Sequence, residues 1–293
     1  MSVASPTCPI SAFVTAYGRR EATLKTIERL QSCRPAPAEI WVHVDGGGKT
    51  LAGEIEARFP AVHVIVSDAR IGPGGGRNRL LREARHELVA SFDDDSFPAD
   101  EDFFQRALVA SAAHPEAAVL AAVVLDGTNA HAANPRQPLR VASFVGCGCV
   151  YRRDVFLTTS GYVPLPLAYG MEEVDLAIRL HVQGRRIMLD PALRVVHELD
   201  LAHRLSLQVR AAMMANMVLF VFLRYPVVLW PLGAVQCLRK AVELLLGGGW
   251  RAILAGLRGL PALLSEHREH RQPLPSGAIL SYILLRRRAA QHG

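Results

Sequence analysis

Two periods of hydrophobic and polar positions alternate along the first 200 residues. β-Branched apolar runs at 10–16 and 39–44 predict strands, whereas Leu24, Ile27 and Leu30 follow the helical period. The alternation continues through a helix at 51–59, a strand at 62–66, a helix at 77–85, a strand at 88–92, a helix at 100–114 and a strand at 117–124. Strands that alternate with helices predict a mainly parallel sheet covered on both faces.

The rest of this region is predicted to extend the sheet. We expect one strand at 141–151 and two short strands at 187–189 and 193–196, with a helix between them that Gly184 ends. In sheets of this kind, ligands bind beyond the carboxyl ends of the strands. The polar residues that follow the strands are therefore the first candidates for a functional site.

From about residue 204 the pattern changes to longer apolar stretches. Residues 211–223 and 225–238 are uncharged and are separated by Arg224. Each stretch is shorter than the roughly 20 residues that cross a bilayer, and joining them would bury a charge. We expect helices that lie on a membrane surface with arginines at the headgroups. The alternatives are a helical cap, or an interface that would make the protein a homo-oligomer.

The distribution of charge supports a division at the same place. The net charge of the 293 residues is +6, which alone would suit nucleic-acid binding, but residues 1–203 carry −3 and residues 204–293 carry +9. The basic part lacks interleaved aromatic residues, so no nucleic-acid partner is expected. We predict a catalytic domain at 1–203 and a basic helical region at 204–293 that binds an anionic membrane surface.

Cysteine usage indicates the compartment. The five cysteines are an odd number without regular spacing, and the sequence begins without a secretory signal. This pattern is typical of a reducing environment. The expected location is the cytoplasm, peripherally at the inner face of the plasma membrane.

Three consecutive aspartates, Asp93 to Asp95, end a predicted strand. Hard cations prefer oxygen ligands, and adjacent carboxylates repel one another unless a cation lies among them. Asp93 and Asp95 should point the same way, hold Mg²⁺ or Mn²⁺, and leave Asp94 to turn elsewhere. The alternative is a solvated acidic turn that caps the next helix.

A glycine-rich loop, Gly72 to Gly76, precedes Arg77 and Asn78. It departs from G-x-G-x-x-G, because Arg77 stands where the third glycine should be. Such a loop before a basic helix start suits close approach to a nucleotide or phosphate. A simple tight turn is the alternative.

Glu172 and Glu173 open a predicted helix after a proline-rich loop. They could complement the helix dipole, with Asp175 and Arg179 forming a surface pair four residues apart. They could also provide the carboxylate that takes a proton from an incoming hydroxyl. A mobile loop that closes over a substrate favours the second role.

Together these segments resemble the family 2 glycosyltransferases with the GT-A fold, over roughly residues 8–200. The resemblance rests on Val14–Tyr17 with Arg19, Val44–Gly46, Gly72–Asn78, Phe92–Asp95, Gly146–Gly148 and Gly170–Leu176. It implies a Rossmann-like α/β fold, a mainly parallel mixed sheet with helices on both faces. A C-terminal helical, amphipathic extension follows it.

The resemblance also implies roles for single residues. Thr15 and Tyr17 would lie near the nucleotide base, and Asp45 would contact the base or ribose. Glu173 would be the catalytic base, with Glu172 as the alternative because Met171 is inserted before it. The remaining nucleotide-sugar-binding candidates are Arg19, Gly72, Arg77, Asn78 and Asp94, and the metal-binding candidates are Asp93, Asp95 and His197. An ordinary surface histidine is the alternative for His197.

The implied reaction is inverting transfer of a hexosyl or deoxyhexosyl group from a nucleotide diphosphate sugar to an acceptor hydroxyl. A lipid-linked or cell-envelope glycan, as in polysaccharide biosynthesis, is the expected acceptor. A sugar-phosphate nucleotidylyltransferase is one alternative, but the residues 17–20 do not supply its G-x-G-T-R loop. A non-catalytic membrane-bound scaffold is another, which the retained acidic residues disfavour.

Overall fold

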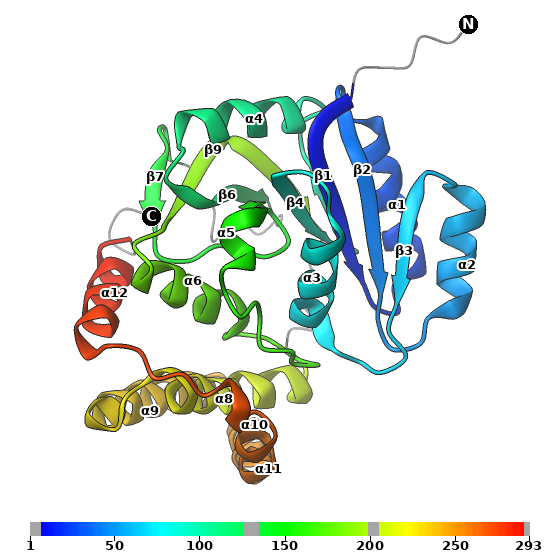
Figure 1. Cartoon of the computed structure of the whole chain (residues 1–293). Coiled ribbons are helices and arrows are strands. Elements are labelled where there is room, and N and C mark those ends of the chain that lie inside the picture. Colours follow the sequence, from blue (N-terminus) through cyan, green and yellow to red (C-terminus); the bar gives the residue numbers. More distant parts are fainter. Residues whose placement is uncertain (1–6, 126–134, 199–204, 290–293) are drawn as a thin grey trace, which may run out of the picture.

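The computed structural model describes residues 7–125, 135–198 and 205–289, and within them one mixed sheet forms the centre of the molecule (Figure 1). Its strand order is β3-β2-β1-β4-β8-β6-β9-β5, and β7 pairs with β9. The strands are β1 (Thr7–Ala16), β2 (Ala36–Val44), β3 (Val62–Val66), β4 (Leu88–Asp93), β5 (Ser96–Pro98), β6 (Ala117–Leu125), β7 (Leu139–Val141), β8 (Cys149–Arg152) and β9 (Arg186–His197).

The pairing confirms a mainly parallel mixed sheet. Strands β3, β2, β1 and β4 are all parallel, and β6 is parallel to β9. Strand β8 runs antiparallel to both of its neighbours, β4 and β6. The parallel half therefore brings the carboxyl ends of β1, β2 and β4 to one edge.

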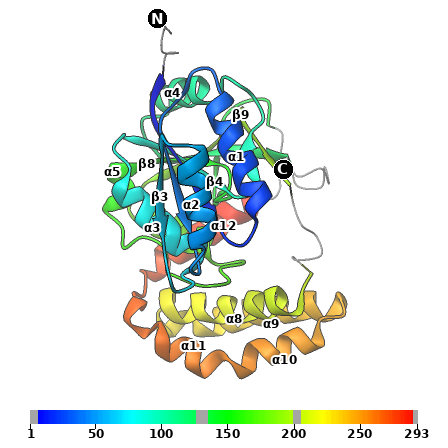
Figure 2. The same cartoon turned by 90° about the vertical axis from the view of Figure 1, so that its right-hand side faces the viewer.

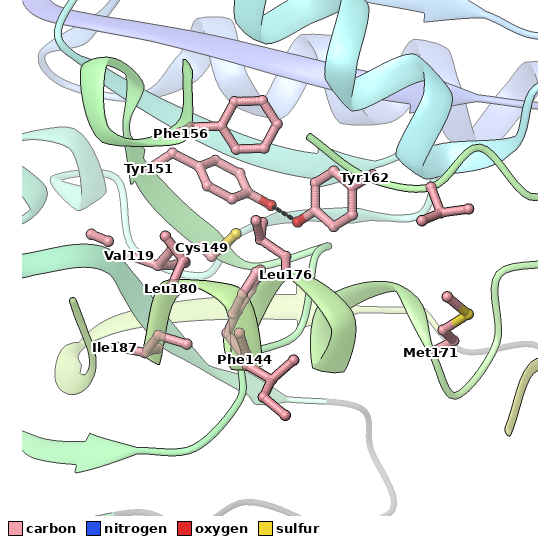
Figure 3. Close-up of a cluster of buried hydrophobic side chains, with 14 of the residues drawn as sticks. Val119, Phe144, Cys149, Tyr151, Phe156, Tyr162, Met171, Leu176, Leu180 and Ile187 are labelled. Carbon is pink, nitrogen blue, oxygen red and sulfur yellow. Dashed lines mark hydrogen bonds between the residues drawn. The ribbon is translucent and has the colours of Figure 1, made fainter. Parts of the chain in front are cut away.

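Helices cover both faces of the sheet, as predicted. Alternate residues of β1 point into two different cores: Ala12 and Val14 pack with α1, α2 and α4, whereas Phe13 packs with α3, α5 and α6. In the second core Tyr151 and Tyr162 point toward one another beside Leu176 of α6 (Figure 3). The helices are α1 (Arg20–Ser32), α2 (Lys49–Arg58), α3 (Gly72–Glu83), α4 (Phe103–Ala113), α5 (Arg153–Leu157) and α6 (Glu172–Val182).

The structure corrects the predicted loop at the glycine run. Helix α3 begins at Gly72, so the glycines form its first turns. The carboxylate of Asp45 accepts hydrogen bonds from the amides of Ile71 and Gly72, which would otherwise be unpaired at the helix start. A Cβ at Gly76 would lie 2.5 Å from His43 Nδ1, so the absence of side chains lets this helix approach β2.

Two strand predictions were also wrong. The segment 141–151 is not one strand, because β7 and β8 are separate and pair with different neighbours. The two pieces at 187–189 and 193–196 are one strand, β9, whose register against β6 shifts between Ala122 and Val123. The shift leaves Pro191, Ala192 and Leu193 without register partners on β6, and the Ala192 amide donates to Asp190 Oδ1 at 2.9 Å.

The helices between residues 207 and 266 form a layer beside one end of the sheet, whereas the last helix packs against α6 (Figure 1 and Figure 2). Residues of α8 and α12, such as Leu219 and Ile279, belong to the same core as α6. One hydrophobic core is therefore shared by residues before and after position 204. The predicted division into two domains at 203 and 204 stays a prediction. The elements are α8 (Leu207–Arg224), η1 (Val227–Leu229), α9 (Trp230–Leu246), α10 (Trp250–Arg258), α11 (Leu260–Glu266), η2 (Arg268–His270) and α12 (Ser276–Ala289).

The two apolar stretches take different environments. Among the helices of the described residues, α8 alone is long and apolar enough to cross a membrane by length and composition, and 44% of that span is buried inside the protein. Its last residue, Arg224, is 1% exposed and bonded to Asp175 of α6. Helix α8 therefore packs against the sheet domain, and the second stretch, in η1 and α9, is the one with large exposed apolar side chains.

Candidate active site

Parallel pairing brings polar residues from three strands to one edge of the sheet. Thr15 at the end of β1 lies opposite Asp93 at the end of β4, and its hydroxyl donates to Asp93 Oδ1 at 2.7 Å. Asp45 follows β2 directly, and its backbone amide donates to Ala16 O. The predicted placement of these residues at the carboxyl edge of the sheet is confirmed.

The second and third aspartates are buried and have partners. Asp94 is 7% exposed and accepts a hydrogen bond from the Tyr17 amide at 3.1 Å, while Asp95 is 6% exposed. Asp95 accepts from the Arg19 guanidinium and lies 3.3 Å from His197 Nε2. A solvated acidic turn is therefore wrong for these two residues, and His197 at the end of β9 is not an ordinary surface histidine.

Burial and charge act on these groups in opposite directions. Burial raises the pKa of Asp94 to about 7, although the Tyr17 amide opposes the shift. Burial also acts to raise the pKa of Asp95, but the hydrogen bonds and charges of His197 and Arg19 together outweigh it and hold this pKa below its usual value. Burial lowers the pKa of His197 less than Asp95 raises it, so the net shift is upward. Asp95 therefore favours the protonated form of His197, and a cation would bind this histidine only after it loses that proton.

Arg77 lies beneath the site as a bridge between two elements. It is 2% exposed, its Nη1 donates to Glu172 Oε1 at 2.7 Å, and its Nη2 donates to Asp93 Oδ1. Its Nε donates to Ser91 Oγ at 3.3 Å. This arrangement differs from the predicted contact with a nucleotide or phosphate: all three donor groups are directed at the protein, where they join α3, β4 and α6.

Three other predicted nucleotide-sugar-binding residues hold loops together. Asn78 brackets Tyr162 by donating to its carbonyl at 2.9 Å and accepting from its amide at 2.8 Å. Asp45 caps the start of α3, as described above. Gly72 has a φ of +72°, and a Cβ there would overlap the carbonyl oxygen of Leu165. In this structure Asn78 and Asp45 bond to backbone groups of the protein, and Gly72 leaves room for the backbone of Leu165.

The two glutamates that open α6 differ in environment. Glu172 is buried against Arg77, and burial raises the pKa of its carboxyl to about 8 despite that positive charge. Glu173 is half-buried and accepts a hydrogen bond from the Gly146 amide at 3.0 Å. A Cβ at Gly146 would lie 2.8 Å from Arg77 Cζ and 2.9 Å from Glu173 Oε1, so this glycine lies closely between them.

The predicted ion pair between Asp175 and Arg179 of α6 forms, but its environment differs from the expected surface position. Asp175 and Arg179 are bonded at 2.8 Å, but their side chains are 1% and 5% exposed, so the pair is buried and not on the surface. Arg224 of α8 is a second partner of Asp175. The sequence could not indicate this partner, which lies 49 positions away.

An exposed aromatic side chain lies at the outer end of the edge. Tyr17 is 48% exposed, and the Arg70 guanidinium lies 4.1 Å from its ring centroid. Gly46 allows this placement, since a Cβ there would lie 2.9 Å from the Tyr17 ring. Sequence reasoning missed Arg70, because no motif marks the loop after β3.

The described residues contain no ready-made cluster of three or more acidic, histidine or cysteine side chains for a metal. Asp95 and His197 nevertheless form an oxygen and nitrogen donor pair, and Arg19 supplies a positive charge to the same carboxylate. Mg²⁺ and Mn²⁺ are often held by one or two protein groups together with substrate phosphates and water. The residues present fit such a cation.

The sheet order and the carboxylates at its edge define a glycosyltransferase with the GT-A fold. Residues 11–158 match the family model described as Glycosyl transferase family 2. The chain belongs to glycosyl transferase family 2. No curated protein sequence matches it.

Solved structures share the fold at low sequence identity. The mannosyltransferase PcManGT from Pyrobaculum calidifontis, in complex with GDP-Man and Mn²⁺, has a TM-score of 0.57 at 15% identity, covering 98% of this chain and 85% of its own. GalNAc-T7, with UDP, GalNAc and Mn²⁺, has a TM-score of 0.59 at 14% identity, covering 75% of this chain and 49% of its own. TarS 1-349 of S. aureus, in complex with UDP-GlcNAc, has a TM-score of 0.55 at 15% identity, covering 71% of this chain and 66% of its own.

Proposed function

We propose that the protein transfers a hexosyl or deoxyhexosyl group from a nucleotide diphosphate sugar to an acceptor hydroxyl, with inversion at the anomeric carbon. The observation that carries this proposal is the joining of Asp93, Arg77 and Glu173 around Gly146. It connects the aspartate edge to a half-buried carboxylate on another element. The donor and the base would thus meet at one place.

Glu173 is the general base in this proposal. Among the described contacts its carboxylate accepts one hydrogen bond, from the Gly146 amide, and it keeps acceptor capacity for the proton of an incoming hydroxyl. Glu172 is bonded to Arg77 and buried, so its role is to position Arg77. The inserted Met171 leaves the choice between Glu172 and Glu173 open, and these contacts support Glu173 as the base.

We assign Mg²⁺ or Mn²⁺ to Asp95 and His197, with Asp93 beside them. When bound, the cation supplies positive charge that stabilises the leaving diphosphate. Two of the solved structures with this fold contain Mn²⁺. Arg19 is placed to neutralise Asp95 and to contact the donor phosphates, while Tyr17 offers an exposed aromatic face to the base.

The acceptor in this proposal is a lipid-linked or cell-envelope glycan at the inner face of the plasma membrane. Most large apolar side chains that are exposed lie after residue 204. On α9 and α10 they recur at helical spacing, which gives two stripes on the protein surface. These α9 and α10 stripes comprise Val235, Leu238, Val242, Leu245 and Leu246, then Trp250, Leu254 and Leu257.

Donor use is tested by thermal shift with UDP-, GDP- and dTDP-sugars, with and without Mn²⁺. At least one sugar nucleotide should raise the melting temperature, and Mn²⁺ should increase the shift. Glu173→Gln should keep this shift but lose transfer by about 100-fold or more. Stabilisation by none of the donors would refute the donor proposal, and full transfer by Glu173→Gln would refute its role as base.

Membrane association is tested separately by co-sedimentation with phosphatidylglycerol vesicles. Leu254, 61% exposed on α10, is replaced by Asp, which should weaken binding because it places a charge in the apolar stripe. Val109→Asp is the matched control, since Val109 is 63% exposed on α4 of the sheet domain. Equal binding by both variants would contradict the proposed surface.

A further inference from the structure

Three buried polar side chains of the C-terminal helical layer reach the segment that leads into Glu172 and Glu173. Asn216 and Arg224 lie on α8 and are 3% and 1% exposed, and His267 follows α11 and is 5% exposed. Each is bonded to the segment 164–175, which contains the loop before α6 and the first turn of that helix. We refer to Asn216, Arg224 and His267 as the clamp.

Two clamp residues hold the loop by its backbone. Asn216 Nδ2 donates to Leu167 O at 2.7 Å and to Tyr169 O at 3.1 Å. His267 Nε2 lies 3.1 Å from Pro164 O. Because the partners are backbone carbonyls, the contacts fix the path of the loop into Glu172 and Glu173.

The third clamp residue holds the helix itself. Arg224 Nε and Nη2 both donate to the Asp175 carboxylate, and Nη1 donates to His270 O at 3.0 Å. Asp175 also accepts from Arg179, so two buried guanidinium groups share one carboxylate. Buried ion pairs contribute little net stability, and their best-attested use is to specify one geometry.

The clamp is connected to the exposed α9 and α10 stripes through close helix contacts. A Cβ at Gly233 of α9 would overlap Val221 of α8. A Cβ at Gly256 of α10 would lie 2.5 Å from Ala211 O. Helices packed at this distance transmit strain to one another, because close-packed interiors have low compressibility.

We propose that the clamp residues are positioning residues, through which the C-terminal helices set the geometry of the catalytic segment, so that docking on a membrane orders that segment. The coupling deepens the proposed function and rests on its membrane surface. Neither Asn216 nor Arg224 touches the aspartate edge among the described contacts. We therefore expect Asn216 and Arg224 to act on the position of Glu173, the proposed general base, and not on the aspartates.

The test is hydrogen exchange of the full chain, followed by mass spectrometry of peptides within 162–176, with and without vesicles of phosphatidylglycerol and phosphatidylcholine. Vesicles should slow exchange in this segment of the wild-type protein. Asn216→Ala should raise exchange there about tenfold in solution, since two hydrogen bonds to the loop are lost. It should still co-sediment with vesicles but lose their effect on the segment.

Arg210→Ala is the control on the same helix. Arg210 donates to Leu244 O and Gly247 O, both within the C-terminal layer, so its loss should leave exchange at 162–176 unchanged. The clamp is refuted if Asn216→Ala exchanges like the wild type or if Arg210→Ala loosens the segment equally. The coupling is refuted if vesicle protection of the segment survives Asn216→Ala. Absence of vesicle binding by the wild type refutes the membrane surface, whereas exchange in solution still decides the clamp.

Discussion

Replacing Arg77 by Met tests whether the bridge beneath the site is held by charge. Methionine fills similar space but cannot donate to Glu172, Asp93 or Ser91. The substitution leaves Glu172, whose side chain is 3% exposed, without its only charged partner among the described contacts. A carboxylate in that position is destabilising unless it takes up a proton.

The expected loss of unfolding free energy is about 3–5 kcal/mol, the range for breaking a buried ion pair by removing one partner. It should increase with pH, because burial already raises the pKa of Glu172 to about 8. Removing Arg77 also removes the positive charge that lowers this pKa, so the pKa of the unpaired carboxyl rises further and the added loss develops above about pH 8. Adding Glu172→Gln to Arg77→Met should therefore cost less than the sum of the two single substitutions.

The assay is urea denaturation followed by circular dichroism, with Arg79→Met as the control. Arg79 lies on the same helix but is exposed, so its substitution should change stability by about 0.5 kcal/mol or less. Equal losses for Arg77→Met and Arg79→Met would refute the charge bridge. Strict additivity of the double substitution would refute the pairing with Glu172.

Three further outcomes are expected. Asp95→Ala should raise the Mn²⁺ concentration needed for donor-induced thermal stabilisation about tenfold or more; an unchanged titration would exclude Asp95 as a ligand. Gly72→Ala should cost about 1–3 kcal/mol in urea, since φ is +72° and the Leu165 carbonyl is in the way. Gly53→Ala, with open space in α2, should not destabilise. Because the pKa of Asp94 is raised to about 7, wild-type stability should fall as pH rises from about 4 to about 7. Asp94→Asn should show a smaller fall than the wild type in thermal melts, because Glu172 contributes in the same direction, and parallel curves would contradict the role of Asp94.

The period of the hydrophobic pattern predicted most of the fold because it depends on local burial. The strand 62–66 and the helix after Met171 have their expected places, and parallel pairing then had to bring Thr15, Asp45 and Asp93 to one edge. The order of motifs was enough to predict the family. Each of these inferences needed only residues close in sequence or a rule about sheets.

The failures involve contacts between distant residues. Glycine has poor helix propensity, so the start of α3 could not be predicted without the capping carboxylate of Asp45, 27 residues away. Arg77 reads as a phosphate ligand until Glu172, 95 positions later, is placed beside it. Glu172 and Glu173 are adjacent and chemically alike, so their proposed roles could be separated only once the structure showed that Glu172 is the one bonded to Arg77.

Charge counting in the C-terminal region meets the same limit. From the sequence alone, residues 204–293 carry a net charge of +9, and Arg224 would be buried in the bilayer if the two apolar stretches formed one membrane helix. In the structure Arg224 neutralises Asp175 of the sheet domain, and Arg271 donates to Phe222 O, so neither is free for a lipid headgroup. Arginines that remain exposed, such as Arg239 and Arg251, belong to the helices with the apolar stripes. Basic residues of one region thus divide into a group bonded within the protein, of which Arg224 belongs to the proposed clamp, and an exposed group that suits the proposed anionic surface, and this division joins the two proposed roles of the C-terminal helices.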